Sequence, residues 1–344
     1  MSTSVQYKPE WIREDFIDFI AEKINPVWAL KKVKACVVEI QALSPDFYKI
    51  HLRPNQNFQA QRFQAGQSIL VTLAMNGVRQ QRSYSIVTLL DNGDVILAIK
   101  RQGKMSNALT RLPAGAVVEL SQPQGNFVLP APVPSLCFIA SGSGITAIYS
   151  LLQKAVVSST QPIDLLYFTR DDAFHAEIKT LALMYPHFKY HHFNTVEQHQ
   201  HQHQHLSLSL LQNTVEQLGE RHIYACGSAS MMQAAQQICQ QLDLSEQFHS
   251  EYFQMTADAT LEAQPVQFLR SQQDFQANSN LLDSAEAAGL RPAHGCRMGI
   301  CNTCSCTKVS GSVRNLLTGE IDHNHNTQIK LCVTQAISPV VINL

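Results

Sequence analysis

The segment HGCRMGICNTC, residues 294–304, decides how the C-terminal part of the chain must fold. The segment contains three closely spaced cysteines, Cys296, Cys301 and Cys304, and a fourth, Cys332, follows farther along the chain. Four residues separate the first two, two separate the next two, and the last follows 28 positions later. Three closely spaced thiolates require a tight loop in which the sulfurs converge, with the fourth supplied by a separate element. Gly295 and Gly299 permit such turns and bring backbone amides near the sulfurs, where they help to carry negative charge.

This spacing is typical of plant-type [2Fe–2S] ligation. A structural zinc site with four cysteines usually shows two short pairs, whereas this segment has a triplet and a singleton. The spacing therefore favours an iron–sulfur cluster over zinc. Cys306 lies two residues beyond Cys304 and could compete with it, although the spacing favours Cys304. The remaining cysteines in apolar runs are interpreted as packing residues, namely Cys36, Cys137 and Cys239.

Length and composition limit the alternatives. A chain of 344 residues suggests two or three domains, and 45% apolar with 15% charged residues is ordinary for a soluble protein. The net charge of -1 gives no general reason to expect nucleic acid or an anionic membrane as a partner. No apolar run approaches the roughly 18 residues of a transmembrane helix, and no secretory signal is evident. Nine cysteines without such a signal indicate reduced thiols, so we expect a cytoplasmic location.

The hydrophobic pattern changes along the chain. Residues 10–24 predict an amphipathic helix that ends at Asn25-Pro26. Short β-rich runs with turn signals then predict an antiparallel barrel, and apolar strands that alternate with helices predict a parallel α/β sheet. A histidine-rich run at 198–205 is interpreted as a solvated loop, with metal binding as the alternative. The predicted domains are a helical extension at 1–33, a flavin barrel at 34–131, a nucleotide domain at 132–254, a linker at 255–264 and a cluster domain at 265–344.

The cluster segment carries a family resemblance. HGCRMGICNTC, the following GSVRNLLTGEI and KLCVTQA together resemble the ferredoxin domain of bacterial reductases that fuse a flavin domain to a plant-type ferredoxin. The resemblance implies the ferredoxin–NADP reductase superfamily and an α+β fold of the β-grasp type for the last domain. It extends over nearly the whole chain, because two further sets of motifs match.

The flavin motifs lie in the predicted barrel. Residues 82–85, RSYS, resemble the superfamily segment that contacts the flavin. The resemblance implies that Arg82 pairs with the phosphates, Tyr84 lies against the flavin and Ser85 bonds near N5. A guanidinium suits a pyrophosphate, and an aromatic ring excludes water from one face of the isoalloxazine. Gly103 and Ser106 match the GxxS segment that binds flavin phosphate. Because FAD is usual in the subgroup that the chain resembles, the resemblance implies FAD, with FMN as the alternative.

The nucleotide motif follows the apolar strand LCFIA. Gly142, Gly144 and Ala147 form a G-x-G-x-x-A pattern with a strand before it and a helix after it, as the dinucleotide fingerprint requires. By the resemblance, Thr146 lies near the nicotinamide.

Two more residues are carried over from the family. The segment Cys226-Gly227-Ser228 matches the family motif CGP with serine for proline, which implies Cys226 near nicotinamide C4. Glu251 and Phe253 resemble residues near the flavin edge. The alternatives are a buried strand-end thiol for Cys226 and simple strand packing for Glu251.

The choice between NADPH and NADH depends on residues 169–172, TRDD, at the end of the second strand. An arginine there can hold the 2′-phosphate of NADPH, whereas an acid can bond the ribose hydroxyls of NADH. Arg170 comes first after the strand, so the order favours NADPH while NADH stays open.

Together the motifs predict a path for electrons. A nicotinamide delivers two electrons as a hydride, whereas a [2Fe–2S] cluster accepts one at a time, so a flavin between them can split the pair. We therefore predict an NAD(P)H-dependent reductase that feeds a separate oxygenase-type acceptor. The extension with Trp11 and Trp28, followed by NGVRQQRSYSI, resembles reductases that serve membrane acyl-CoA or fatty-acid desaturases. That resemblance implies work at a membrane surface through the acceptor.

Other functions remain open at this point. The runner-up acceptor is a Rieske ring-hydroxylating oxygenase or another hydroxylase. Different classes are a redox-sensing flavo-iron–sulfur protein and a reductase that releases reduced flavin. For the N-terminal helix, packing on the flavin domain is preferred over docking of a partner.

Overall fold

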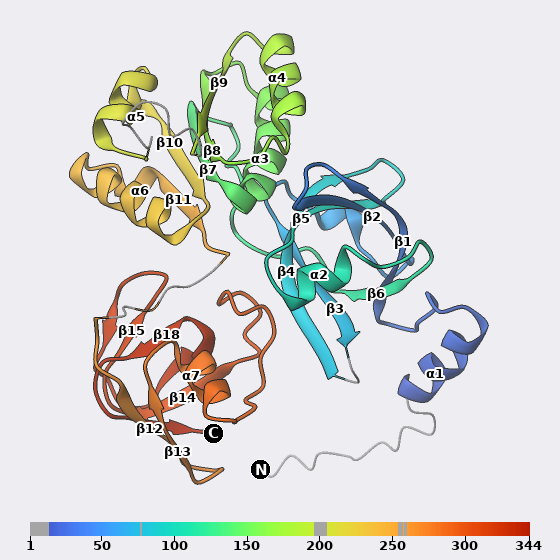
Figure 1. The fold of residues 1–344 in the computed structure, drawn as a ribbon, viewed down its shortest axis with the longest axis vertical. Coiled ribbons are helices and arrows are strands. Elements are labelled where there is room, and N and C mark those ends of the chain that lie inside the picture. The colour runs from blue at the N-terminus through green and yellow to red at the C-terminus, as the bar shows by residue number, and fades with distance from the viewer. Residues whose placement is uncertain (1–13, 76–77, 196–204, 254–256, 258–259) are drawn as a thin grey trace, which may run out of the picture.

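The chain folds into three domains in a computed structural model, which describes residues 14–75, 78–195, 205–253, 257 and 260–344. Figure 1 shows the barrel (blue to teal), the α/β domain (green to yellow) and the C-terminal domain (orange to red) arranged around a common centre. The three predicted fold types, an antiparallel barrel, a parallel α/β sheet and an α+β domain, are confirmed.

The first domain is a closed six-stranded antiparallel barrel with the strand order β1-β2-β5-β4-β3-β6. The strands and short helices are β1 (Val33–Ala42), β2 (Phe47–Pro54), η1 (Ala60–Arg62), β3 (Ser68–Met75), β4 (Val78–Leu89), β5 (Val95–Lys100), α2 (Lys104–Leu109) and β6 (Val117–Leu120). Alternate residues of the strands fill the core, so that Ile69, Ile86 and Leu97 are almost completely buried.

The helix α1 (Glu14–Ile24) precedes the barrel. The first residues of the predicted helix, with Trp11 and Ile12, lie outside the described part of the chain. The apolar side chains of Phe19 and Ile20 are 53% and 46% exposed, so this side of the helix is not buried in a core.

The second domain has a five-stranded parallel sheet with the order β11-β10-β7-β8-β9. Its elements are β7 (Leu136–Ser141), η2 (Gly142–Gly144), α3 (Ile145–Ser158), β8 (Ile163–Thr169), α4 (His175–Met184), β9 (Phe188–Asn194), α5 (Leu208–Thr214), η3 (Leu218–Glu220), β10 (His222–Cys226), α6 (Ala229–Gln241), η4 (Ser245–Gln247) and β11 (Phe248–Glu251). Two apolar clusters cover the two faces of the sheet, one with α3 and α4 and the other with α5 and α6. Residues 198–204 of the histidine-rich run lie outside the described residues.

The third domain has a mixed sheet of order β13-β12-β19-β14-β17 and a small sheet β16-β15-β18. Its elements are β12 (Gln264–Phe268), β13 (Gln273–Ala277), α7 (Leu281–Ala287), β14 (Ser305–Ser310), β15 (Val313–Asn315), β16 (Ile321–Asp322), β17 (Thr327–Lys330), η5 (Leu331–Val333), β18 (Thr334–Ala336) and β19 (Val340–Asn343). Helix α7 packs on this core, and residues 291–304 form the loop in front of β14. No helix in the described ranges is long and apolar enough to cross a membrane.

Candidate functional site

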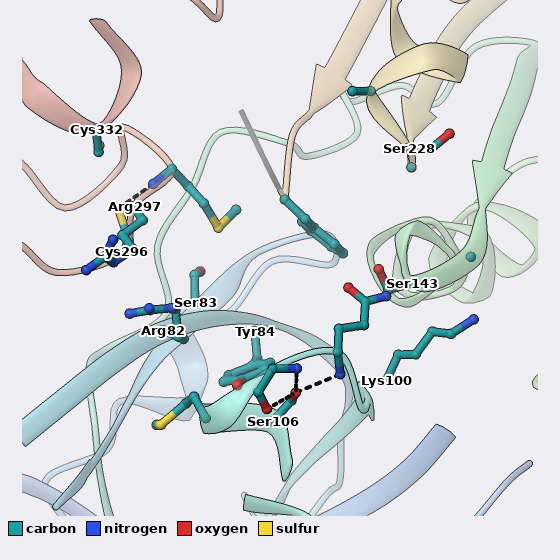
Figure 2. A pocket seen from close by; sticks show the side chains of 18 of the residues that line it. Arg82, Ser83, Tyr84, Lys100, Ser106, Ser143, Ser228, Cys296, Arg297 and Cys332 are labelled. Carbon is teal, nitrogen blue, oxygen red and sulfur yellow. Dashed lines mark hydrogen bonds between the residues drawn. The ribbon is translucent and has the colours of Figure 1, made fainter. Parts of the chain in front are cut away.

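A cleft of about 2400 Å³ lies where the three domains meet. Its volume is well above the roughly 300–1,000 Å³ of a pocket for one small molecule, so two large cofactors can share it. Figure 2 shows Arg82 and Tyr84 of the barrel between Cys296 and Cys332 of the third domain and Ser228 of the nucleotide domain. The cleft therefore brings residues from all three sets of predicted motifs into one cavity.

Strand β4 presents the flavin motif to this cleft. Burial raises the pKa of the Tyr84 hydroxyl well above its ordinary value, so the ring offers a neutral, half-buried face. Burial also lowers the pKa of the Arg82 guanidinium, with the nearby Arg297 acting in the same direction, although an arginine stays charged. The Ser85 hydroxyl lines the cleft and is buried without a hydrogen-bond partner among the described residues. A cation, an aromatic face and an unsatisfied hydroxyl fit the phosphates, ring and polar edge of FAD.

The turn before α2 lies beside the flavin motif. The Ser106 hydroxyl accepts hydrogen bonds from the backbone N–H groups of Gln102 and Gly103, both at 3.0 Å. It also donates to the Gly103 carbonyl at 3.1 Å. Ser106 thus shapes the turn that lines the cleft, in addition to the phosphate contact that the resemblance implies.

The nucleotide motif lies at the carboxyl end of the parallel sheet, where ligands bind in folds of this kind. Gly142 has a φ of +51°, a left-handed conformation that suits glycine. A Cβ on Gly144 would lie 2.0 Å from the carbonyl oxygen of Cys226, so only glycine lets α3 approach β10 this closely. The Thr146 hydroxyl lines the cleft and donates to the Ser143 carbonyl at 3.0 Å.

Serine in place of the family's proline has a structural role. The Ser228 backbone N–H donates to the Ser141 hydroxyl at 2.8 Å, and the Ser228 hydroxyl accepts from the N–H of Met231 at the start of α6. Ser228 is therefore the N-cap of α6, which sequence reasoning missed although serine is a favoured cap residue.

Cys226 and Glu251 lie next to each other on the parallel strands β10 and β11. Both are buried, and the cleft lining contains Gly227 and Phe253 but neither of these two side chains. Burial raises the pKa of the Cys226 thiol, and the neighbouring Glu251 raises it further. Burial raises the pKa of Glu251 to about 8, and one of its carboxyl oxygens has no partner in the described structure. Near neutral pH these groups therefore form a protonated pair behind the wall of the cleft.

Arg170 and Asp171 follow β8 and are directed differently. Arg170 is exposed and lines the cleft. Asp171 instead forms an ion pair with Lys100 of the barrel at 2.9 Å. In the sequence, Arg170 favoured NADPH and the neighbouring acids left NADH open. In the structure, Arg170 lines the cleft, whereas Asp171 pairs with Lys100.

The four cysteines of the third domain converge as two close pairs. The Cys304 and Cys332 sulfurs lie 3.3 Å apart, and the Cys301 sulfur accepts a hydrogen bond from the N–H of Cys296 at 3.2 Å. The Cys296 sulfur accepts from three backbone N–H groups, those of Met298, Ile300 and Cys301, each at 3.3 Å. Two pairs of sulfurs with amide donors around them fit two bridged irons.

Hydrogen bonds within each pair of thiols favour loss of one proton per pair. The hydrogen bond with the neighbouring thiol is the main cause that lowers the pKa of Cys301 and of Cys304. Cys306 is buried in the domain core on β14, and burial raises its pKa to about 12. The Cys304 sulfur is the one that pairs with the Cys332 sulfur, which agrees with the preference for Cys304.

A small apolar contact joins the cluster loop to the other two domains. Leu70 of β3, Cys296 and Met298 are buried together, and Phe253, Ile300 and Cys301 pack against them. Gly295 lies so close to the barrel that a Cβ on it would be 2.7 Å from the Gln81 side-chain oxygen. Sequence reasoning missed Leu70 and Met298, because nothing in a single apolar residue indicates a contact between domains.

Comparisons with known proteins agree with this arrangement. Residues 34–129 match the model of the oxidoreductase FAD-binding domain, residues 138–237 the oxidoreductase NAD-binding domain, and residues 267–336 the 2Fe-2S iron-sulfur cluster binding domain. The predicted cofactor classes, a flavin, a pyridine nucleotide and a [2Fe–2S] cluster, are confirmed at the level of domains.

Similar proteins extend along most of the chain. It is 30% identical to an NADPH oxidoreductase of Mycobacterium tuberculosis over 93% of this chain and 86% of that protein. It is 25% identical to phthalate dioxygenase reductase of Burkholderia cepacia over 88% and 94% of the two chains. A solved structure of a phthalate dioxygenase reductase superposes with a TM-score of 0.63 at 24% identity, covering 91% of this chain and 98% of that one. The chain therefore belongs to the ferredoxin–NADP reductase superfamily of oxidoreductases, in the group that carries a fused C-terminal [2Fe–2S] domain.

Proposed function

We propose that this chain is an NADPH-dependent reductase that passes electrons through FAD and its [2Fe–2S] cluster to a separate, oxygenase-type acceptor protein. The observation that carries the proposal is the single cleft lined by the flavin motif, the nucleotide motif and two of the cluster cysteines. When bound, FAD supplies the exchange between a two-electron hydride and single electrons.

Each part of the cleft has a task in this proposal. Arg82 would bind the flavin phosphates, and Tyr84 would shield one face of the ring from water. The buried Ser85 hydroxyl would form its hydrogen bond with the edge of the flavin ring. Gly103 and Ser106 shape the turn at the phosphates. Residues around the strand ends hold the nucleotide, namely Gly142, Gly144, Thr146, Arg170 and Gly227.

Cys226 and Glu251 lie behind the wall of the cleft, next to Gly227, which lines it. Because both are protonated near neutral pH, they would keep that wall uncharged beside a bound nicotinamide. The four cysteines Cys296, Cys301, Cys304 and Cys332 would hold the cluster, and two of them, Cys296 and Cys332, line the cleft.

The nucleotide is proposed to be NADPH. Arg170 lines the cleft and can bind the 2′-phosphate, whereas Asp171 is engaged by Lys100. The similar mycobacterial protein is named an NADPH oxidoreductase, which agrees with this choice.

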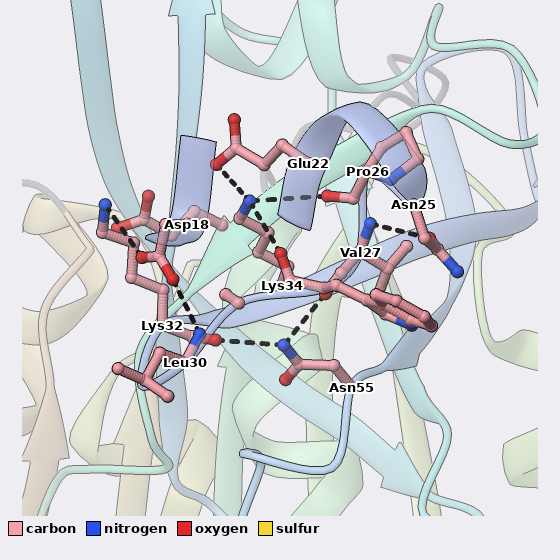
Figure 3. Close-up of polar contacts among 12 residues, drawn as sticks. Asp18, Glu22, Asn25, Pro26, Val27, Leu30, Lys32, Lys34 and Asn55 are labelled. Carbon is pink, nitrogen blue, oxygen red and sulfur yellow. Dashed lines mark hydrogen bonds and ion pairs between the residues drawn. The ribbon is translucent and has the colours of Figure 1, made fainter. Parts of the chain in front are cut away.

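The acceptor is proposed to be a membrane-associated desaturase, and the N-terminal extension supports this choice. Figure 3 shows how α1 is attached: Asp18 accepts a hydrogen bond from the N–H of Leu30 at 2.7 Å, and Glu22 pairs with Lys34. Lys34 also lies within 3.4 Å of the carbonyls of Pro26 and Trp28. Because the acidic side of the helix makes these contacts, its apolar side stays exposed, and Trp28 is exposed as well. An exposed apolar helix face suits an acceptor at a membrane surface.

A ring-hydroxylating oxygenase is the second candidate acceptor. It is supported by the likeness to phthalate dioxygenase reductase. Purified full-length protein with NADPH should therefore be combined separately with a membrane desaturase and with a Rieske oxygenase. Product formation with only the oxygenase would replace the first acceptor by the second.

The electron path itself is tested with Cys301→Ser. We expect this variant to lose cytochrome c reduction while NADPH still reduces the flavin, and Cys306→Ser to behave like the unaltered protein. Unchanged cytochrome c reduction by Cys301→Ser would favour release of reduced flavin instead. Absence of steady turnover with any acceptor would favour a redox sensor.

A further inference from the structure

An ion pair crosses from the flavin barrel to the nucleotide domain at the cleft. Lys100 is the last residue of β5, and Asp171 is the second residue after β8. The Lys100 Nζ lies 2.9 Å from a carboxylate oxygen of Asp171, and the two side chains are only 18% and 16% exposed. Contacts of this kind are stronger than those of a fully solvated pair, because less water screens the charges.

The rest of Asp171 is also held. Its second carboxylate oxygen accepts a hydrogen bond from the N–H of Ala173 at 3.2 Å. Its backbone N–H donates to the Thr169 hydroxyl at 3.1 Å, and that hydroxyl lies 3.1 Å from the Asp171 carbonyl. Lys100 and the local turn therefore fix both the position and the charge balance of this aspartate.

The consequence appears at the cleft. Of residues 169–172, all of them in the described structure, Thr169 and Arg170 line the cleft and the two aspartates do not. An aspartate released beside Arg170 would compete for its guanidinium and repel a phosphate, since both are anions. It could also accept hydrogen bonds from ribose hydroxyls, as acids at this strand end do in NADH-binding proteins.

We infer that Lys100 is a positioning residue for nucleotide selectivity: it holds the Asp171 carboxylate away from Arg170, so that Arg170 meets a 2′-phosphate unopposed. The inference rests on the proposed binding of NADPH in this cleft. It assigns the selectivity to a pair of residues on two domains, and Lys100 acts through Asp171.

Lys100 also lines the cleft, so a second physical role must be separated from this one. As a direct phosphate ligand it would bind nucleotides by its own charge. Masking of Asp171 and direct binding both predict that loss of Lys100 weakens binding. They differ when Asp171 is neutralised as well.

The experiment measures dissociation constants of 2′,5′-ADP and 5′-AMP for the full-length protein by calorimetry, so that no electron transfer is needed. The selectivity is the dissociation constant of 5′-AMP divided by that of 2′,5′-ADP. We expect Lys100→Met to lower it about tenfold, the effect of losing one hydrogen bond to a charged group. Lys100→Arg should keep it, because the ion pair is retained. Asp171→Asn should keep or raise it, and Lys100→Met with Asp171→Asn should restore it.

A matched control is Lys189→Met, which breaks an ion pair with Glu216 at 3.1 Å elsewhere in the nucleotide domain. It should leave the selectivity unchanged. If the double variant binds 2′,5′-ADP as weakly as Lys100→Met, Lys100 contacts the phosphate and the inference is wrong. The inference is also wrong if Lys100→Met keeps the selectivity of the unaltered protein. It is wrong as well if Asp171→Asn lowers the selectivity as much as Lys100→Met does, because the ion pair would then only hold the two domains together.

A failure of the proposed function would give other results than a failure of this inference. In that case the unaltered protein would show no preference for 2′,5′-ADP, or NADPH would not reduce its flavin and cluster. A selective unaltered protein with an unaffected Lys100→Met variant would leave the proposed function in place and overturn only the inference.

Discussion

Replacing Glu251 by glutamine should remove a pH dependence of stability that the structure predicts. Burial raises the pKa of Glu251 from 4.5 to about 8. Between these values the unfolded chain releases a proton that the folded chain keeps, so stability falls as pH rises. Over pH 6 to 8 this linkage lowers the free energy of unfolding by about 2 kcal/mol. Glutamine has nearly the same shape and no proton to release, so the variant should lose that contribution.

The assay is thermal unfolding of the full-length protein at pH 6 and pH 8, with flavin and iron contents matched. Because a protein with several domains and bound cofactors need not unfold in two states, the change in melting temperature between the two pH values is the quantity to compare. Glu246→Gln is the control, because that glutamate is exposed. The reasoning is refuted if Glu251→Gln shows the same loss of melting temperature at pH 8 as the unaltered protein.

Three further substitutions test the packing of the nucleotide domain and the contact between the cluster loop and the barrel. Gly144→Ala places a Cβ against the Cys226 carbonyl; we expect it to destabilise the nucleotide domain by about 1–3 kcal/mol and weaken 2′,5′-ADP binding, and a normal melting temperature would contradict the close packing. Met298→Ala removes the buried contact with Leu70; stopped-flow absorbance should show slower flavin-to-cluster transfer with unchanged reduction of the flavin by NADPH, whereas equal slowing of both steps would speak against a role at the junction. Ser228→Ala removes the α6 cap and should cost about 1 kcal/mol in thermal unfolding, with Ser228→Asn as the variant that restores it.

The sequence was sufficient for the architecture and for the kinds of cofactor. The spacing of the four cysteines is a local constraint on one loop, and the strand–glycine–helix context of Gly142 and Gly144 is equally local. The change from short β-rich runs to alternating apolar strands and helices separated the barrel from the parallel sheet. Such patterns need no knowledge of distant contacts, which is why they could be interpreted along the chain.

Contacts between distant residues could not be predicted in this way. Lys100 and Asp171 are 71 positions apart, and the sequence showed an arginine and two acids without indicating which of them face the cleft. The helix α1 gives another example. Its periodicity predicts an apolar side, but the ion pair of Glu22 with Lys34 decides that the acidic side is the one that packs.

The most direct test of the account is an anaerobic titration of the purified protein with NADPH, followed by visible absorbance and by electron paramagnetic resonance. The account predicts bound FAD, iron and sulfide in the ratio of one [2Fe–2S] cluster per chain, and reduction of both centres by NADPH. Stoichiometric zinc at the four cysteines, or a flavin that becomes reduced while an intact cluster stays oxidised, would contradict it.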